Sequence, residues 1–169
     1  CIRDSDTNMS KYLYLAILIT FSYTESYNMQ LLSFIPYEED CSDITGFGLL
    51  GHLKEICASS KVKARLTMKD IPLIAGVTHL VDQGIYPGGT LRNLESVDSS
   101  ILWGNDLSYA EKVLLCDAQT SGGLLISVPR YGLTDLKKEL AINSVTSKSD
   151  VGEILAKTKL QKGKLIQII

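Results

Sequence analysis

A carboxylate and a hydroxyl precede a glycine-rich segment in residues 43–52, which have the sequence DITGFGLLGH. Asp43 and Thr45 supply oxygen atoms, and the apolar residues that follow recur at helical spacing. The start of a helix has backbone N–H groups without intrahelical partners and carries the positive end of the helix dipole. This combination suits an anion or a metal-bound phosphate. The structural alternative is that Asp43 or Thr45 caps the helix and the glycines permit close packing.

A second polar segment with paired glycines follows in residues 116–125, which have the sequence CDAQTSGGLL. Two consecutive glycines can adopt positive φ and turn successive N–H groups toward one point, which makes a nest for an anion. Thr120, Ser121 and Gly122 are therefore the candidate lining of a phosphate cleft. An ordinary loop between a helix and a strand is the alternative for the same residues.

The other histidines and cysteines indicate little chemistry. His52 is expected on the surface of a helix, and His79 has no acidic or cysteine neighbour at ligand spacing. Cys41 and Cys116 adjoin the two motifs, and we expect small buried thiols there rather than redox groups. The four cysteines of the chain show no paired spacing, which favours a reducing cytoplasm over a disulfide framework or a zinc site.

The composition is that of a globular domain, with 169 residues, 45% of them hydrophobic and 21% charged. A net charge of −2 provides no basic field for nucleic acid. The longest apolar run, residues 12–21, has about half of the ~20 residues that cross a bilayer as a helix, and acidic residues precede it, unlike in a signal peptide. We therefore expect no membrane partner. Residues 157–164 carry four lysines, which we interpret as a solvated turn.

The elements that position the two motifs are irregularly alternating helices and strands. Apolar periodicity predicts a helix over residues 46–59 and a half-buried strand over residues 62–68. Proline and paired glycines predict a turn or loop over residues 86–90. Further predicted elements are a helix over 74–84, a helix over 105–116 with a capping box at Ser108 and Glu111, a strand over 123–128, a helix over 133–140 and strands over 151–155 and 165–169. This pattern favours an α+β (α/β) fold, with helices layered on a mixed sheet.

Together the two motifs resemble the C-terminal domain of the selenophosphate synthetases (selenide, water dikinases), members of the superfamily of aminoimidazole ribonucleotide synthetase (PurM-like). PGGT at residues 87–90 and the pair Arg92-Asn93 lie between the motifs in the same order and spacing. Phe47 distinguishes this family, because the ribonucleotide synthetases resemble the chain at Asp-Ile-Thr-Gly but usually continue with glycine. The likeness covers residues 41–169, which are therefore the expected C-terminal domain.

Residues 1–40 do not match the family and are expected to be an N-terminal segment or linker. A diverged linker and an incorrectly joined coding segment would both explain the mismatch. Because these residues show neither a helix nor a strand period, we expect them to be less firmly packed than the rest.

The resemblance implies an enzyme that makes selenophosphate from selenide, ATP and water, for selenocysteine synthesis. In the family the ATP-binding N-terminal domain supplies the reactive Cys or selenocysteine, a Lys, the glycine-rich loop and most Mg²⁺ ligands. No catalytic residue is therefore expected in this chain, which should be inactive alone. The resemblance assigns Asp43 as one Mg²⁺ ligand facing the ATP phosphates. It also implies three partners, which are the ATP-binding domain, a second copy in a homodimer and the substrate selenide.

Two alternatives remain for the function. The first is another ATP-dependent enzyme of the superfamily, such as the ribonucleotide synthetase or thiamine-phosphate kinase, against which Phe47 and residues 116–123 argue. The second is a non-catalytic interaction module that pairs with a complete synthetase.

Overall fold

A computed structural model of the chain describes residues 13–19, 41–120, 122–142, 145 and 147–169. Its strands are β1 (Leu13–Ile19), β2 (Cys41–Asp43), β3 (Lys63–Leu66), β4 (Ile101–Leu102), β5 (Leu124–Pro129), β6 (Ser147–Leu155) and β7 (Ile166–Ile168). Its helices are α2 (Gly48–Ser59), α3 (Val77–Asp82), α4 (Gly88–Asp98), α5 (Tyr109–Leu115) and α6 (Leu133–Ile142), with short 3-10 turns η2 (Met68–Asp70) and η3 (Arg130–Gly132). None of the helices in these ranges is long and apolar enough to cross a membrane.

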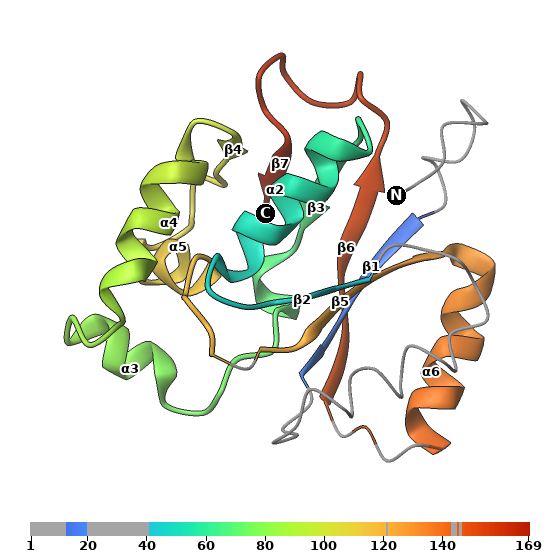
Figure 1. The fold of residues 1–169 in the computed structure, drawn as a ribbon, viewed down its shortest axis with the longest axis horizontal. Helices are drawn as coiled ribbons and strands as arrows, with labels where there is room; N and C mark the ends of the chain where they lie inside the picture. Colours follow the sequence, from blue (N-terminus) through green and yellow to red (C-terminus); the bar gives the residue numbers. More distant parts are fainter. Residues whose placement is uncertain (1–12, 20–40, 121, 143–144, 146) are drawn as a thin grey trace.

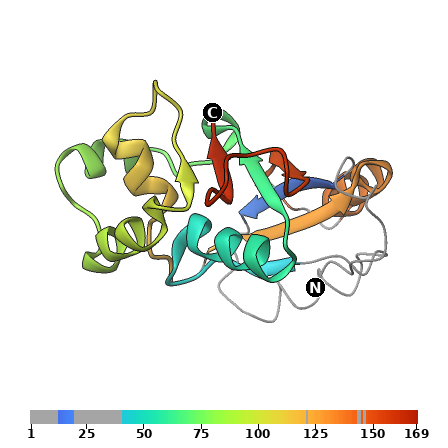
Figure 2. The same cartoon turned by 90° about the horizontal axis from the view of Figure 1, so that it is seen from above.

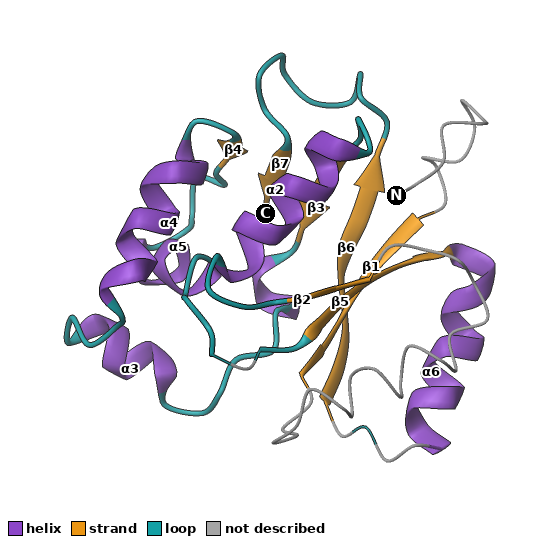
Figure 3. Ribbon diagram, in the orientation of Figure 1, coloured by secondary structure: helices purple, strands orange, loops and turns teal. Residues whose placement is uncertain are grey.

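The strands form one mixed sheet of seven strands in the order β2-β5-β1-β6-β3-β7-β4. β7 pairs in parallel with β3 and with β4, and the other neighbours pair antiparallel. Figure 1 and Figure 3 show α3, α4 and α5 gathered at the β4 end of the sheet and α6 beside the opposite end. The expected α+β class, with helices layered on a mixed sheet, is confirmed.

Apolar clusters lie on both faces of the sheet, and the side chains of β5 alternate between them. Leu125 belongs to the larger apolar cluster, which includes Leu50 and Leu53 of α2. Leu124 and Ile126 point the other way, into a cluster that includes Leu136 and Leu140 of α6. Since successive side chains of a strand point to opposite faces, α2 and α6 cover opposite faces of the sheet. Figure 2 shows α2 lying along one of these faces.

Helix α2 is held by a single apolar stripe. Leu49, Leu50, Leu53 and Cys57 are buried, at the spacing that places them on one side of a helix. They pack in the same cluster as side chains of β3, β6 and β7. Each fully buried leucine stabilises the fold by about 1.5–3 kcal/mol relative to an exposed one. This packing fixes the position of both ends of α2, and therefore of the motif that precedes it.

Most of the predicted elements are confirmed, including the capping box at the start of α5. The Glu111 backbone N–H donates to Ser108 Oγ at 3.2 Å, and the Ser108 backbone N–H donates to Glu111 Oε2 at 2.8 Å. These reciprocal bonds satisfy two amides that the helix itself leaves without partners.

The loop predicted over residues 86–90 is wrong from Gly88 onward. Pro87 has extended backbone and is the N-cap of α4, and Gly88, Gly89 and Thr90 form its first turn. Proline suits the start of a helix because no intrahelical bond needs its missing N–H. Glycine opposes a helix by about 1 kcal/mol per residue, so contacts made elsewhere by α4 must stabilise this turn.

Strand β1 lies in the interior of the sheet, between β5 and β6. Ile17 lies opposite Leu125 of β5 on one edge and Ser149 of β6 on the other. Leu13–Ile19 is therefore a strand where no strand period was found in the sequence; the rest of residues 1–40 lies outside the described ranges. Because this run is continuously apolar, it lacks the alternation of apolar and polar residues from which a half-buried strand is predicted, and the sequence did not indicate β1. The domain limits, 1–40 and 41–169, stay a prediction.

We expect the backbone amides of Leu13–Ile19 to exchange slowly with solvent, because this strand is paired on both edges. Native-state hydrogen exchange should show protection of Leu15 to Leu18 comparable with that of their partners in β5. Exchange as fast as in the exposed residues of α3 would contradict the pairing.

Candidate functional site

The two glycine motifs lie side by side and are joined through their backbones. The Ile44 N–H donates to Gly123 O at 2.9 Å, and the Gly122 N–H donates to Ile44 O at 3.1 Å. These bonds extend the pairing of β2 with β5. Farther along, the Gln119 N–H donates to Thr45 O at 3.1 Å. The loop of the second motif thus binds the first motif through amides of its own backbone.

Gly48 brings the start of α2 against the end of α5. Its φ is +68°, and a Cβ at this position would lie 2.6 Å from the carbonyl carbon of Cys116 and 2.8 Å from Asp117 O. Another residue type would cost about 1 to 3 kcal/mol for the backbone conformation alone. It would also push the two motifs apart, because the atoms in contact are backbone atoms that have no freedom to rotate away. Glycine is therefore required here.

Helix α4 ties the two motifs together from a third direction. Asn93 Nδ2 donates to Gly46 O at 2.8 Å and to Cys116 O at 3.1 Å, so one side chain binds both motifs. Thr90, one turn earlier, is fully buried. Its Oγ1 donates to Asp117 Oδ1 at 2.9 Å and accepts from the Ala118 N–H at 3.3 Å. These contacts stabilise the glycine-containing first turn of α4.

His52 holds the hydroxyl-bearing residue of the first motif. The Thr45 N–H donates to His52 Nε2 at 3.1 Å, and Thr45 Oγ1 lies 3.1 Å from the same nitrogen. A ring nitrogen that accepts from an amide carries no proton, so this contact needs the neutral tautomer with its proton on Nδ1. The ring also meets Phe47 edge-on, with centroids 5.8 Å apart. The histidine expected to be an ordinary surface residue thus organises the motif.

Asp43 is the last residue of β2, and it is exposed. The N-cap of α2 is Phe47, and no side chain accepts a capping hydrogen bond there. The alternative in which Asp43 or Thr45 caps the helix is therefore wrong. The first turn of α2 contains no acidic residue, so no carboxylate within that turn neutralises the positive end of the helix dipole.

The predicted phosphate-cleft residues have different environments. Thr120 is exposed, and Ser121 lies outside the described residues. The Gly122 N–H is already bonded to Ile44 O, so it is not available to an anion nest. A Cβ there would overlap with Ile44 O. Gly122 is therefore needed for close approach of the two motifs, and its part in a cleft stays a prediction.

The thiols in the core carry no charge at neutral pH. Burial raises the pKa of Cys116 to about 12, and the negative charge of Asp98 acts in the same direction. Burial likewise raises the pKa of Cys57 to about 12. A nucleophilic cysteine must be a thiolate, so neither residue is prepared to act as one.

A complete metal site does not form within the described ranges, where no three His, Cys, Asp or Glu residues are grouped. The chemistry of the donor fits one part of such a site, because a carboxylate oxygen is the ligand type that Mg²⁺ prefers. Asp43 therefore fits as one ligand among several, and the others would have to come from outside this part of the chain.

Sequence reasoning missed the roles of Thr90, Asn93 and Asp117. A signal was present, because PGGT and Arg92-Asn93 belong to the pattern that marked the resemblance. Thr90 and Asn93 are three residues apart, which places them on one face of a helix. That spacing becomes informative only when residues 88–98 are recognised as helical.

We expect Asn93→Ala to lower the free energy of unfolding by about 1–2 kcal/mol, because two carbonyls lose their donor. Asn93→Asp should be more destabilising, because a carboxylate has no donor and its negative oxygen atoms would repel the two carbonyl oxygens. Chemical denaturation measures both changes, with Glu95→Ala on the exposed side of α4 as the control. An Asn93→Asp variant as stable as the wild type would show that amide donation does not hold the motifs together.

The chain matches a known protein family over most of its length. Residues 39–161 match the family model described as AIR synthase related protein, C-terminal domain. Curated proteins named selenide, water dikinase are similar in sequence. The one from Haemophilus ducreyi is 50% identical over 98 residues, which are 58% of this chain and 28% of that protein. The one from Aliarcobacter butzleri is 36% identical over 137 residues, covering 77% of this chain and 39% of that protein.

The chain therefore spans well under half the length of these curated relatives. Among solved structures, Escherichia coli HypE, a hydrogenase maturation protein, has the same fold with a TM-score of 0.63. That likeness covers 92% of this chain and 46% of HypE at 14% sequence identity, so it concerns the fold alone. With the family model, the relatives and the fold in agreement, the chain belongs to the AIR synthase related family as its C-terminal domain, and its sequence relatives are selenide, water dikinases.

Proposed function

We propose that this chain is the C-terminal part of a selenide, water dikinase, which makes selenophosphate from selenide, ATP and water. The observation that carries the proposal is the position of Asp43, exposed at the edge of two joined motifs and close in sequence to the start of α2. Relatives named selenide, water dikinase, at 36% and 50% identity, support this assignment over other enzymes of the superfamily.

The proposed task of Asp43 is to bind one Mg²⁺ ion that is also bound by ATP. The ion, when bound, neutralises phosphate charge and orients the phosphate oxygens. Pairing of β2 with β5 holds the Asp43 backbone, and Gly48 and Asn93 fix the adjoining start of α2. A carboxylate on such a support keeps its position when ATP binds, which is the condition for organising a metal site.

The remaining machinery is proposed to come from an ATP-binding domain. Cys57 and Cys116 are protonated, and the described ranges hold no complete metal site. The proposed active site therefore lies between residues 41–169 and that domain, with Thr120 and Gly122 at its phosphate side. The proposed partners are the ATP-binding domain, selenide and, in the complete enzyme, a second copy of it in the cytoplasm.

We expect Asp43→Asn, in a complete two-domain enzyme that carries this segment, to lower selenide-dependent turnover by ~10-fold or more, in line with loss of a group that organises a metal. The melting temperature should stay nearly unchanged, because asparagine keeps the shape and Asp43 does not cap α2. Asp106→Asn, an exposed carboxylate in the loop before α5, is the matched control. If Asp43→Asn had the turnover and the Mg²⁺ dependence of the wild type, Asp43 would not be a metal ligand.

The 169-residue chain alone should produce no AMP above background from ATP, Mg²⁺ and selenide, because the proposed nucleophile and most metal ligands are supplied by the other domain. Chromatographic separation of the nucleotides measures the product. Steady AMP production that a mutation within this chain abolishes would show that the chain is an enzyme by itself.

A further inference from the structure

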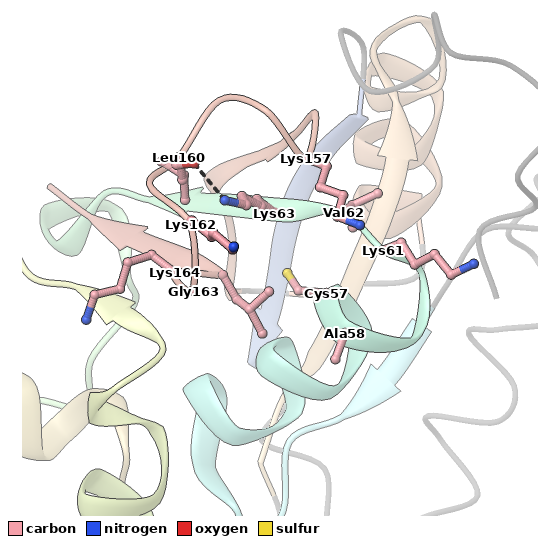
Figure 4. A pocket seen from close by; sticks show the side chains of 11 residues that line it. Cys57, Ala58, Lys61, Val62, Lys63, Lys157, Leu160, Lys162, Gly163 and Lys164 are labelled. Carbon is pink, nitrogen blue, oxygen red and sulfur yellow. Dashed lines mark hydrogen bonds between the residues drawn. The ribbon is translucent and has the colours of Figure 1, made fainter.

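A lysine-lined pocket lies at the C-terminal end of α2, at the other end of this helix from the two motifs. Its volume is about 360 Å³, and Cys57 forms part of its wall (Figure 4). Five lysines line it and no acidic residue does, although the whole chain has more acidic than basic residues. The five are Lys61, Lys63, Lys157, Lys162 and Lys164.

Lys63 is the unusual member of this set, because only 6% of its surface is exposed. Its Nζ donates to Leu160 O at 2.7 Å and to Gln161 O at 2.9 Å. Burial of an ammonium group is costly unless hydrogen bonds compensate it. The two carbonyls are neutral, so the positive charge remains, and the ammonium has a third donor for a further acceptor.

One neighbouring lysine extends toward the same space as Lys63. In Figure 4, Lys162 reaches in toward Lys63 and Cys57, whereas the end of Lys157 lies beside Val62, and Lys61 and Lys164 point away. Lys164 Nζ is bound elsewhere, to Ser99 O at 3.0 Å. Cys57 adds no negative charge, because its buried thiol stays protonated. Lys63 and Lys162 thus bring two ammonium groups to an uncharged wall, an arrangement in which like charges repel unless an anion is present.

We propose that this pocket binds a small phosphate-bearing anion, of the size of inorganic phosphate or pyrophosphate. Lysine ammonium groups bind phosphate as point charges, and they need no planar geometry to do so. The volume is near the lower end of the range for small-molecule sites, which suits a compact ligand. The solvated turn expected for residues 157–164 explains the lysines but not the burial of Lys63.

The pocket is separate from the proposed active site. The 12 residues of α2 lie between them, which is about 18 Å at the rise of an α-helix. The pocket proposal does not depend on the reaction proposed above, and it involves neither Asp43 nor the residues joined to it.

The test is calorimetric and NMR titration of the 169-residue chain with inorganic phosphate and, separately, pyrophosphate, at ionic strength held constant with chloride. We expect saturable binding, with amide shifts in residues 57–63 and 157–165. The variant Lys162→Gln should raise the dissociation constant by ~10-fold, since a charge-assisted contact is lost.

Lys159→Gln is the matched control, because Lys159 belongs to the same turn but does not line the pocket. Its dissociation constant should equal that of the wild type. Stronger binding of pyrophosphate than of phosphate would indicate that the ligand carries more than one phosphate group. The proposal is overturned if neither anion binds saturably, if both variants weaken binding equally, or if the shifts are confined to residues 43–52 and 116–123.

Discussion

The backbone of Gly48 packs directly on the backbone of Cys116 and Asp117, and this contact limits where every neighbouring element can lie. It brings the start of α2 to the end of α5 without any side chain between them. The Gly122 loop then reaches Ile44, and β2 continues its pairing with β5. A side chain at position 48 would displace α2 from the sheet that buries its leucines, so site geometry and core packing depend on the same contact.

Helix α4 shows how the site in turn stabilises a local structure. Its first turn contains two glycines, which favour a loop when considered alone. Thr90 and Asn93 compensate by donating hydrogen bonds to the second motif, Thr90 to Asp117 Oδ1 and Asn93 to Cys116 O. The second motif and α4 therefore depend on one another. This dependence explains why a helix with weak intrinsic propensity lies beside the residues proposed to contact phosphate.

The fold is more widely shared than the chemistry proposed for this chain. HypE has the same architecture at 14% identity, and a fold by itself does not specify a reaction. In the first motif of this chain, Phe47 and His52 are in contact and His52 binds Thr45. Helix α2 separates this polar end from the lysine-lined end, so one rigid element carries two chemically different surfaces.

The sequence by itself determined the elements whose signals are local. The stripe of α2, the capping box at Ser108 and the two motifs each involve residues within about ten positions of one another, so their chemistry is visible in the order of residues. Only the tertiary structure decided the place of β1, the helical state of residues 88–98 and the grouping of Lys63 with Lys162. These depend on partners far away in the chain, whose contribution to the free energy outweighs local propensity and which no short pattern contains.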